Sequence, residues 1–260
     1  MEQEHGTAAK LAALRASIVR IGQSAKAAGS VISFGVPAID GCLPAGGLAL
    51  GALHEVASGG PDIEHGVAAM LLSAGILARL PGQVLWVLER PDLFAPALDA
   101  VGLQGDRVIY AEAGNAATVV LTVEEGLRHT GLAGVVGELS GKLTLTASRR
   151  LQLAAEQSGV TCLVLRRSRR HDDTLFSEPT AAATRWRVTA TPGPSVLAHS
   201  PETPGLARPR WRLDLVRCRG AEPASWIVEA TDETGHLGVL ADLADRPAAA
   251  LSQRRRAVGG

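Results

Sequence analysis

The stretch ISFGVPAIDGCLPAGGLALGALHEVASGGPDIEHGVAAMLLSAGILARL, from Ile32 to Leu80, decides the fold of this chain. It holds a short apolar run at Leu53–Ala57, then a glycine-rich turn, then a long apolar segment from Ile63 to Leu80. Apolar runs of about four to eight residues are typical of strands buried on both faces, and longer segments are typical of helices. The stretch therefore predicts a buried strand, a turn and a helix.

The same alternation continues toward the middle of the chain. Strand-like apolar runs and helical stretches alternate at Val84–Leu88, Val108–Tyr110, Ala117–His129, Ala133–Leu139, Leu143–Gln157 and Val160–Leu165. Long crossovers between buried strands imply parallel pairing. The sequence therefore predicts an α/β fold, with a mostly parallel sheet and helices on both faces. We expect the parallel core to be complete by about Leu165.

The pattern changes after Arg166. The segments Arg185–Ala190, Trp211–Cys218 and Trp226–Ala230 alternate apolar with charged residues, which predicts strands with one wet face in an antiparallel C-terminal extension. We therefore divide the chain into four parts. These are an N-terminal helix (1–30), the α/β core (31–166), an arginine- and proline-rich extension with strands (167–245) and a disordered tail (246–260). The first part carries Leu11, Leu14, Ile18 and Ile21 at helical spacing.

Composition excludes several classes of protein. Lys plus Arg and Asp plus Glu both number 26, so net charge alone indicates no partner. The cysteines Cys42, Cys162 and Cys218 form no CxxC pair, which argues against a disulfide framework or a metal site and favours buried thiols. No apolar run approaches the ~20 residues of a membrane span, so we expect a cytoplasmic protein with no membrane contact.

The turn after the first buried strand stands where a phosphate-binding loop would stand. Such a loop reads G-x-x-x-x-G-K-[ST], because its backbone N–H groups hold phosphate oxygens, its lysine reaches the β and γ phosphates, and its hydroxyl binds Mg²⁺. The aligned residues are Ser58, Gly59, Gly60, Pro61, Asp62, Ile63, Glu64 and His65.

In this alignment Glu64 replaces the lysine and His65 replaces the hydroxyl residue. A carboxylate repels a phosphate that a lysine would attract. Because no lysine lies between Lys26 and Lys142, no shift of the alignment repairs the motif. We expect no bound ATP or Mg²⁺, no other cofactor and no catalysis. The turn is then either a plain strand-to-helix connection or a residual anion or nucleotide site at a helix N-terminus.

The stretch that opens the chain's core resembles the RecA family. The matching residues are Ile39, Asp40, Gly46, Gly47, Leu48 and Gly51, followed by the strand at Leu53–Val56. The resemblance implies that Glu89 and Glu138 are relics of acidic catalytic positions. The alternative for Glu89 is a surface residue or a simple ion pair with the adjacent Arg90. The segment Gly137–Thr144 contains Gly-Lys but fails the phosphate-loop motif in its glycine spacing and in Leu143, where a hydroxyl should stand.

Three longer segments resemble the ImuA family of RecA-related proteins. They are HEVASGGPDIEHG (54–66), PGQVLWVLERPDLFAPALDAVGL (81–103) and LTASRRLQLAAEQSGVTCLVLR (145–166), and the resemblance extends over roughly residues 30 to 230. It implies an accessory role in SOS-induced translesion DNA synthesis, in the assembly called the mutasome. It also implies a scaffold for an ImuB-like inactive polymerase protein and for an error-prone DNA polymerase III alpha-type subunit.

Arginines are concentrated in the second half of the chain and are accompanied there by tryptophans. The candidate DNA- or partner-binding residues are Arg149, Arg150, Arg166, Arg167, Arg169, Arg170, Trp186, Trp211, Arg212 and Trp226. The alternative is that these arginines are solvated or paired with acids. Self-association is a further expectation, because a RecA fold keeps the surfaces used for it. Two rival functions remain open, an active or residual ATP-binding RecA paralogue and an SOS cell-division inhibitor.

Overall fold

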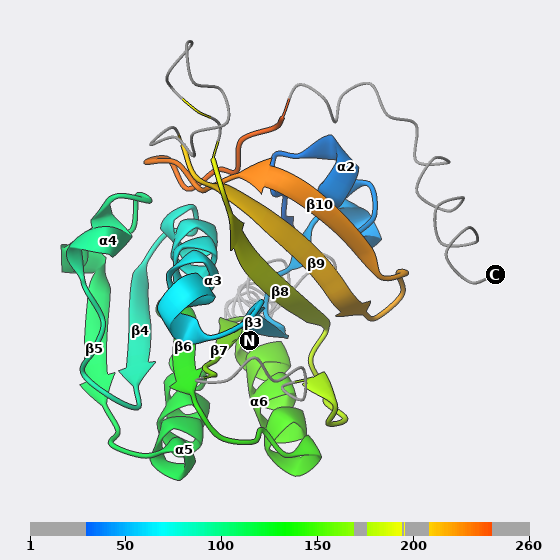
Figure 1. The fold of residues 1–260 in the computed structure, drawn as a ribbon. Helices are drawn as coiled ribbons and strands as arrows, with labels where there is room; N and C mark the ends of the chain where they lie inside the picture. The colour runs from blue at the N-terminus through cyan, green and yellow to red at the C-terminus, as the bar shows by residue number, and fades with distance from the viewer. Residues whose placement is uncertain (1–29, 169–175, 194, 196–207, 241–260) are drawn as a thin grey trace, which may run out of the picture.

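The computed structural model describes residues 30–168, 176–193, 195 and 208–240 (Figure 1). The helix predicted near the N-terminus, the tail at 246–260 and the candidates Arg169 and Arg170 lie outside the described residues. None of the helices in the described ranges is both long enough and apolar enough to cross a membrane.

An eight-stranded sheet forms the centre of the molecule, in the order β10-β9-β8-β3-β7-β6-β4-β5 (Figure 1). Its parallel strands are β3 (Leu53–Ser58), β4 (Gln83–Leu88), β5 (Val108–Glu112), β6 (Leu132–Leu139), β7 (Thr161–Arg166) and β8 (Thr184–Thr191). β9 (Arg210–Cys218) and β10 (Ala224–Glu229) complete the sheet in antiparallel pairing. A separate small sheet pairs β1 (Val31–Ile32) with β2 (Leu48–Ala49).

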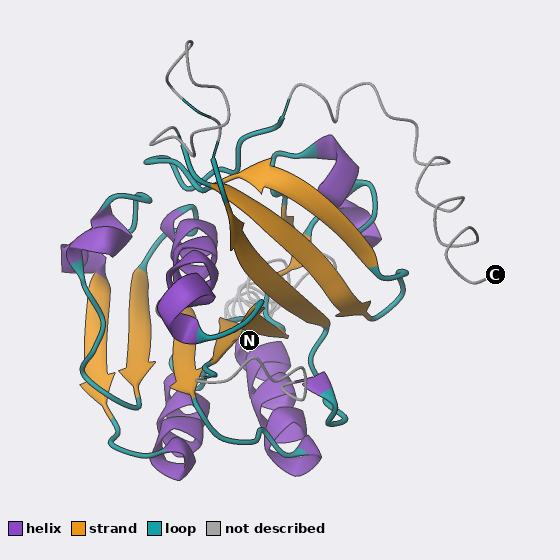
Figure 2. Ribbon diagram, in the orientation of Figure 1, coloured by secondary structure: helices purple, strands orange, loops and turns teal. Residues whose placement is uncertain are grey.

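Helices cover both faces of the large sheet, as the sequence predicts (Figure 2). The long helix α3 (Asp62–Ala78) packs on one face, and α5 (Ala116–Gly126) and α6 (Leu145–Ser158) pack on the other. The short elements are α2 (Pro37–Asp40), α4 (Pro96–Asp99) and the 3-10 helices η1 (Pro44–Gly46) and η2 (Gly105–Arg107).

The two helical layers enclose two hydrophobic clusters. Val56 of β3 packs in the cluster with Leu72 of α3, whereas Leu53 of the same strand packs in the cluster with Val123 of α5 and Leu151 of α6. Since side chains alternate across a strand, β3 contributes to both clusters and is buried throughout. The end of this central strand therefore has a fixed position, and the phosphate-loop turn begins there.

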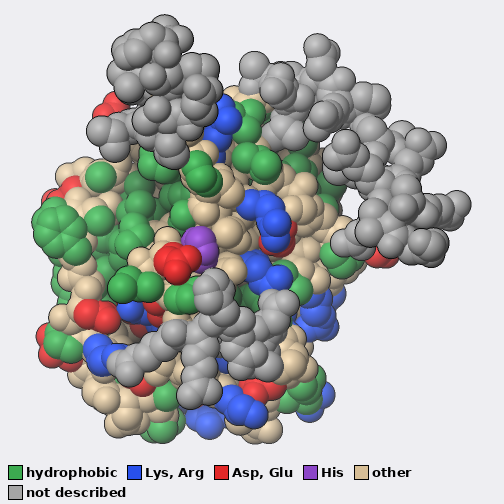
Figure 3. Space-filling view, in the orientation of Figure 1, with side chains coloured by type: hydrophobic (Ala, Val, Ile, Leu, Met, Phe, Trp, Pro, Cys, Tyr) green, Lys and Arg blue, Asp and Glu red, His purple; other side chains and the backbone are tan. Residues whose placement is uncertain are grey.

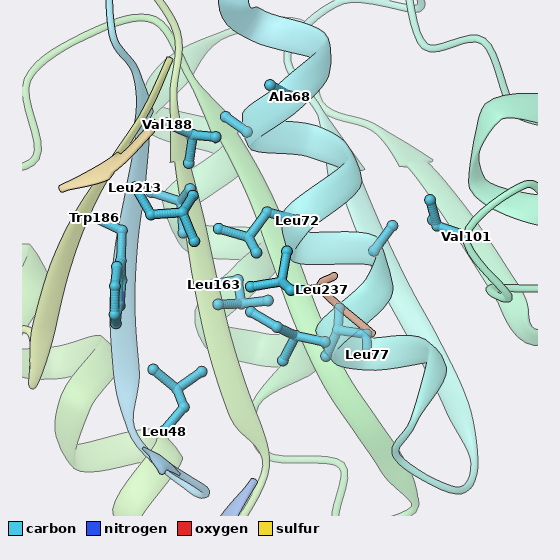
Figure 4. Packing of buried hydrophobic residues seen from close by; sticks show 14 of the residues in the cluster. Leu48, Ala68, Leu72, Leu77, Val101, Leu163, Trp186, Val188, Leu213 and Leu237 are labelled. Carbon is cyan, nitrogen blue, oxygen red and sulfur yellow. The ribbon is translucent and has the colours of Figure 1, made fainter. Parts of the chain in front are cut away.

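The parallel core is not complete by Leu165, contrary to the sequence-based expectation. β8 is parallel to β3 and hydrogen-bonded to it, with Glu55 opposite Arg185. Trp186 is buried 5.2 Å from Phe34, measured between ring centroids, and Trp211 and Trp226 are buried in the same cluster (Figure 4). The extension strands therefore belong to the core of the domain.

Candidate functional site

The turn between β3 and α3 is short and packs closely against β8. It contains Gly59, Gly60 and Pro61 between the strand end at Ser58 and the first helical residue, Asp62. The Gly59 N–H donates to the carbonyl of Val188 at 2.8 Å. A Cβ at Gly59 would lie 1.8 Å from Oγ1 of Thr189, so only glycine fits here without a shift of β8.

Backbone donors around this turn are bonded to the protein itself. Besides Gly59, the N–H of Asp62 donates to the carbonyl of Ser168 at 2.8 Å. The N–H groups of Glu64 and His65 both donate to the carbonyl of Pro61, at 3.0 and 3.1 Å. In a working phosphate loop such groups bind phosphate oxygens. Here four of them already have acceptors.

The two substituted positions lie in the first turn of α3. Glu64 is exposed, and its carboxylate lies 3.7 Å from Nε2 of the more buried His65. Ile63, in the place of the second motif glycine, is 93% exposed. The two positions that the alignment predicts to be altered therefore lie in the first turn of α3, beside the turn that follows β3.

A guanidinium surrounded by carboxylates lies beside the turn. Arg167, directly after β7, places Nε 2.9 Å from Asp62 and Nη2 3.2 Å from Asp92, and it also pairs with Glu138 at the end of β6. Ser58 Oγ donates to the other carboxylate oxygen of Asp62 at 2.9 Å. We call Arg167, Asp62, Asp92 and Glu138 the Arg167 cluster.

Burial and pairing oppose each other in the Arg167 cluster. Burial raises the pKa of Glu138, while Arg167 and a hydrogen bond from Trp86 Nε1 (2.8 Å) act in the opposite direction. Burial alone would lower the pKa of Arg167, but the three carboxylates raise it above its ordinary value. Arg167 therefore stays charged. The cluster lies at the carboxyl ends of parallel strands, where α/β proteins bind their ligands.

Glu89, the other predicted relic, follows β4 and makes local bonds. It accepts from the backbone N–H of Ser140 at 2.8 Å and from Ser140 Oγ at 2.7 Å. It thereby joins the ends of β4 and β6. Lys142, from the second glycine-lysine segment, pairs with Glu178 at 3.1 Å.

Several predicted contact residues are buried, which corrects the sequence-based expectation for them. Arg166 places Nη1 3.0 Å from Glu55, and Arg185 of β8 places Nε 3.3 Å from the other carboxylate oxygen, all three side chains being nearly inaccessible. The buried residues Arg166, Trp186, Trp211 and Trp226 cannot contact DNA or a partner in this structure. Arg166 is buried because it pairs with Glu55. The three tryptophans are buried because they pack in the same hydrophobic cluster as α3.

The other described arginine candidates are at the surface. Arg149 is exposed, Arg150 pairs with Glu124, and Arg212 pairs with Asp214 at 3.1 Å. Their role in binding stays a prediction. Of the cysteines, Cys162 is buried, whereas Cys42 is exposed and Cys218 is half-buried, so the expectation of buried thiols is wrong for Cys42. Within the described ranges, no group of three His, Cys, Asp or Glu side chains is placed to hold a metal ion.

Sequence reasoning missed the partners of the charged groups. Asp92 was not singled out, nor was the contact of Glu55 with Arg166 and Arg185. The one available signal was an acid inside the apolar strand LHEVA, which needs a buried partner. The partners are far away in the chain, so no local spacing reveals them.

Comparison with known proteins shows the family to which the chain is related. No family model matches it. Protein ImuA from each of two strains of Caulobacter vibrioides is 40% identical to it over 240 residues, covering 87% of this chain and 95% of the relative. The chain belongs to the ImuA family. That relationship confirms the resemblance seen in the three longer sequence segments.

A solved structure confirms the fold class. The RadB recombinase matches with a TM-score of 0.55 and 16% identity, over 80% of this chain and 99% of that one. The fold is RecA-like, with a mostly parallel central sheet and antiparallel strands at its C-terminal end. In this member of the ImuA family, the turn between β3 and α3 is closed by its own hydrogen bonds and lies beside the Arg167 cluster.

Proposed function

We propose that this chain is a non-catalytic accessory protein of SOS-induced translesion DNA synthesis. In this role it is a cytoplasmic scaffold of the mutasome, joining an ImuB-like inactive polymerase protein to an error-prone DNA polymerase III alpha-type subunit. Membership of the ImuA family supports the pathway. The Arg167 cluster supports the absence of catalysis, because it engages Glu138, one of the two predicted acidic relics, and lies against the turn that the phosphate-loop motif aligns with.

The charges beside the turn disfavour the binding of a nucleotide. The three carboxylates of the cluster are balanced by one arginine, and Glu64 adds an exposed negative charge at the helix N-terminus. An incoming triphosphate would have to draw Arg167 away from its three carboxylates, of which Glu138 is buried, and approach a carboxylate in place of a lysine. Because Glu138 would then be left buried without its cation, the internal pairing competes with nucleotide.

Co-purification tests the scaffold role. The tagged full chain is expected to retain the ImuB-like protein and the polymerase subunit from the same organism, with no nucleotide added. Retention should not change when Mg-ATP is supplied or when ATP is removed by apyrase. Retention only with ATP would favour the rival, an ATP-binding RecA paralogue. Failure to retain either protein under every condition would contradict the scaffold.

A further inference from the structure

One face of the sheet is left open where β8, β9 and β10 extend beyond the helices. α5 and α6 pack against β3, β4, β6 and β7. Along β9 and β10, Trp211, Leu213 and Trp226 are buried on one side, whereas Arg212 and Ile227 are exposed on the other. We call this second side of the three strands the open face.

Cross-strand register places charged and polar side chains together on the open face. Its rows are Arg187–Asp214–Ser225, Thr189–Arg212–Ile227 and Thr191–Arg210–Glu229. Arg217, opposite Arg185 after a bulge, extends it toward β3. Figure 3 shows Lys and Arg side chains over the region where Figure 1 draws these strands.

Positive charge exceeds negative charge on this face. It carries four arginines (Arg187, Arg210, Arg212 and Arg217) and two acids (Asp214 and Glu229), an excess of two positive charges in a chain with a formal net charge of +0. One of the acids is also engaged elsewhere, since Glu229 lies 3.6 Å from Arg208.

Two of these arginines, Arg212 and Arg217, keep donors for a ligand. Arg212 is half exposed and uses Nε and Nη2 on Asp214, which leaves Nη1 for another acceptor. Arg217 is exposed and uses Nη1 on the carbonyl of Thr180. Nε of Arg210 has no hydrogen-bond partner among the described residues, but it is enclosed by the protein and offers no donor to a ligand. All four basic groups are guanidinium forks, which match phosphate oxygens in shape.

Aromatic rings are not offered to bases on this face. The tryptophans of the three strands point into the core, and Phe176 lies under the guanidinium groups of Arg185 and Arg187. Proteins that bind single strands use exposed rings on which bases stack. Without such rings, the arginines of this face are suited to phosphate contacts, which the backbone of a duplex offers.

We propose that the open face of β8, β9 and β10 binds the phosphate backbone of double-stranded DNA without reading its sequence. The choice of DNA as the polyanion rests on the proposed function, which places the protein at damaged DNA. The face lies beside the closed turn, because Thr189 on it contacts Gly59. Binding at this face requires no nucleotide.

The test compares two variants of the full chain that each lose two positive charges. Arg212→Gln/Arg217→Gln alters the open face, and the control Arg90→Gln/Arg128→Gln removes two exposed arginines that lie away from it, after β4 and after α5. Fluorescence anisotropy with labelled duplexes of two unrelated sequences is measured over a series of salt concentrations. The open-face variant should bind about tenfold more weakly, and its slope of log K against log salt should flatten by about 1.8, as for two lost phosphate contacts. The control should change less than about twofold.

Other outcomes would overturn the assignment. Equal losses in both variants, or tighter binding of single strands than of duplex, would remove the open face as a duplex site. Wild type that binds no DNA yet retains its protein partners would reject this site and leave the scaffold role standing. Loss of partner retention in the open-face variant, with DNA binding unchanged, would make the face a dock for an acidic protein segment.

Discussion

At the scale of single residues, the core is apolar except for a few buried polar and ionisable side chains, several of them on the central strands. Glu55 is paired with two arginines. His54 beside it donates from Nε2 to the carbonyl of Ala49 (2.8 Å), and its Nδ1 is hydrogen-bonded to Thr184 Oγ1 (2.7 Å). Burial penalises an unpaired charge strongly. Substitutions that change charge at these residues should therefore change the free energy of unfolding, and protonation of His54 should make that free energy depend on pH.

His54 should make the protein less stable in mild acid. Burial lowers its pKa from 6.5 to about 4, although the bond to Ala49 opposes the shift. Below pH 6.5 the unfolded chain takes up a proton that the folded chain refuses, so stability is present above that pH and is lost as pH falls toward 4. The loss at pH 5 is about 2 kcal/mol, from about 1.4 kcal/mol per pH unit.

Urea unfolding at pH 7 and pH 5 checks this expectation. His54→Gln should show a smaller difference between the two pH values than wild type, by about 2 kcal/mol. The comparison cancels the groups that titrate in both proteins. An identical pH dependence in the two proteins would show that His54 is protonated as easily in the folded state as in the unfolded one.

Arg166 should matter to folding, in contrast to what its place in an arginine-rich segment indicates. Arg166→Ala removes one of the two arginines that pair with Glu55 in the interior. Removal of one member of a buried pair costs about 3–5 kcal/mol. Thermal unfolding checks the change, with Arg212→Gln as a control at an exposed pair, where the cost is at most about 1 kcal/mol. A cost for Arg166→Ala no larger than the control's would mean that water reaches Glu55.

At the scale of elements, the sequence predicts the order of strands and helices well and their partners less well. The run Leu53–Ala57 and the later apolar runs become β3, β4, β6 and β7, since period and length carry that information. Alternation in Arg185–Ala190 predicts a strand, which is correct, but the predicted wet face is wrong for Arg185, which is buried against Glu55. The pattern also says nothing of the neighbouring strand. β8 pairs with β3 because its apolar side, with Trp186 and Val188, completes the cluster over α3.

The turn between β3 and α3 also shows that sequence patterns locate an element without revealing its partners. Sequence alone locates the turn and identifies Glu64 and His65 as the altered positions. It does not predict that Arg167 occupies the neighbouring space, because Asp62, Asp92 and Glu138 come from three separate connections. Such a cluster forms only when the sheet aligns the strand ends.

Deletion of β9 and β10 should unfold the core. Removal of residues 208–260 exposes Trp186 and the side of β8 that pairs with β9, and it deletes the buried Trp211 and Trp226. The truncated chain should be insoluble or lack a cooperative thermal transition, whereas a chain lacking only 246–260 should unfold like wild type. Near-UV circular dichroism and solubility check this. A soluble, cooperatively folded product from the larger deletion would show that the extension is a separate unit.

At the scale of the whole molecule, the turn after β3 is bound both to the connection after β7 and to strand β8. The connection after β7 is bound directly to the turn after β3, through Arg167 with Asp62 and through the carbonyl of Ser168 with the Asp62 N–H. β8, which begins the open face, contacts the same turn at Gly59. The carboxyl ends of β3 and β7 and the adjoining part of β8 are therefore held together by an ion pair and by backbone hydrogen bonds.

This arrangement predicts that Mg-ATP does not stabilise the protein. A ligand that binds only the folded state adds RT ln(1 + [L]/Kd), about 2.7 kcal/mol at a hundred times Kd, which raises the unfolding midpoint of a chain this size by about 5–10 °C. We expect no rise with 1 mM Mg-ATP in wild type. We also expect none in Glu64→Lys/His65→Thr, because the backbone donors of the turn remain bonded to Val188, Ser168 and Pro61. Differential scanning fluorimetry measures both, with Mg-ATP and an active RecA protein as the positive control. A higher unfolding midpoint in the double variant alone would show that the turn can still open around phosphate and that two side chains suffice to prevent binding. A higher midpoint in wild type would restore the ATP-binding paralogue as the better account of the molecule.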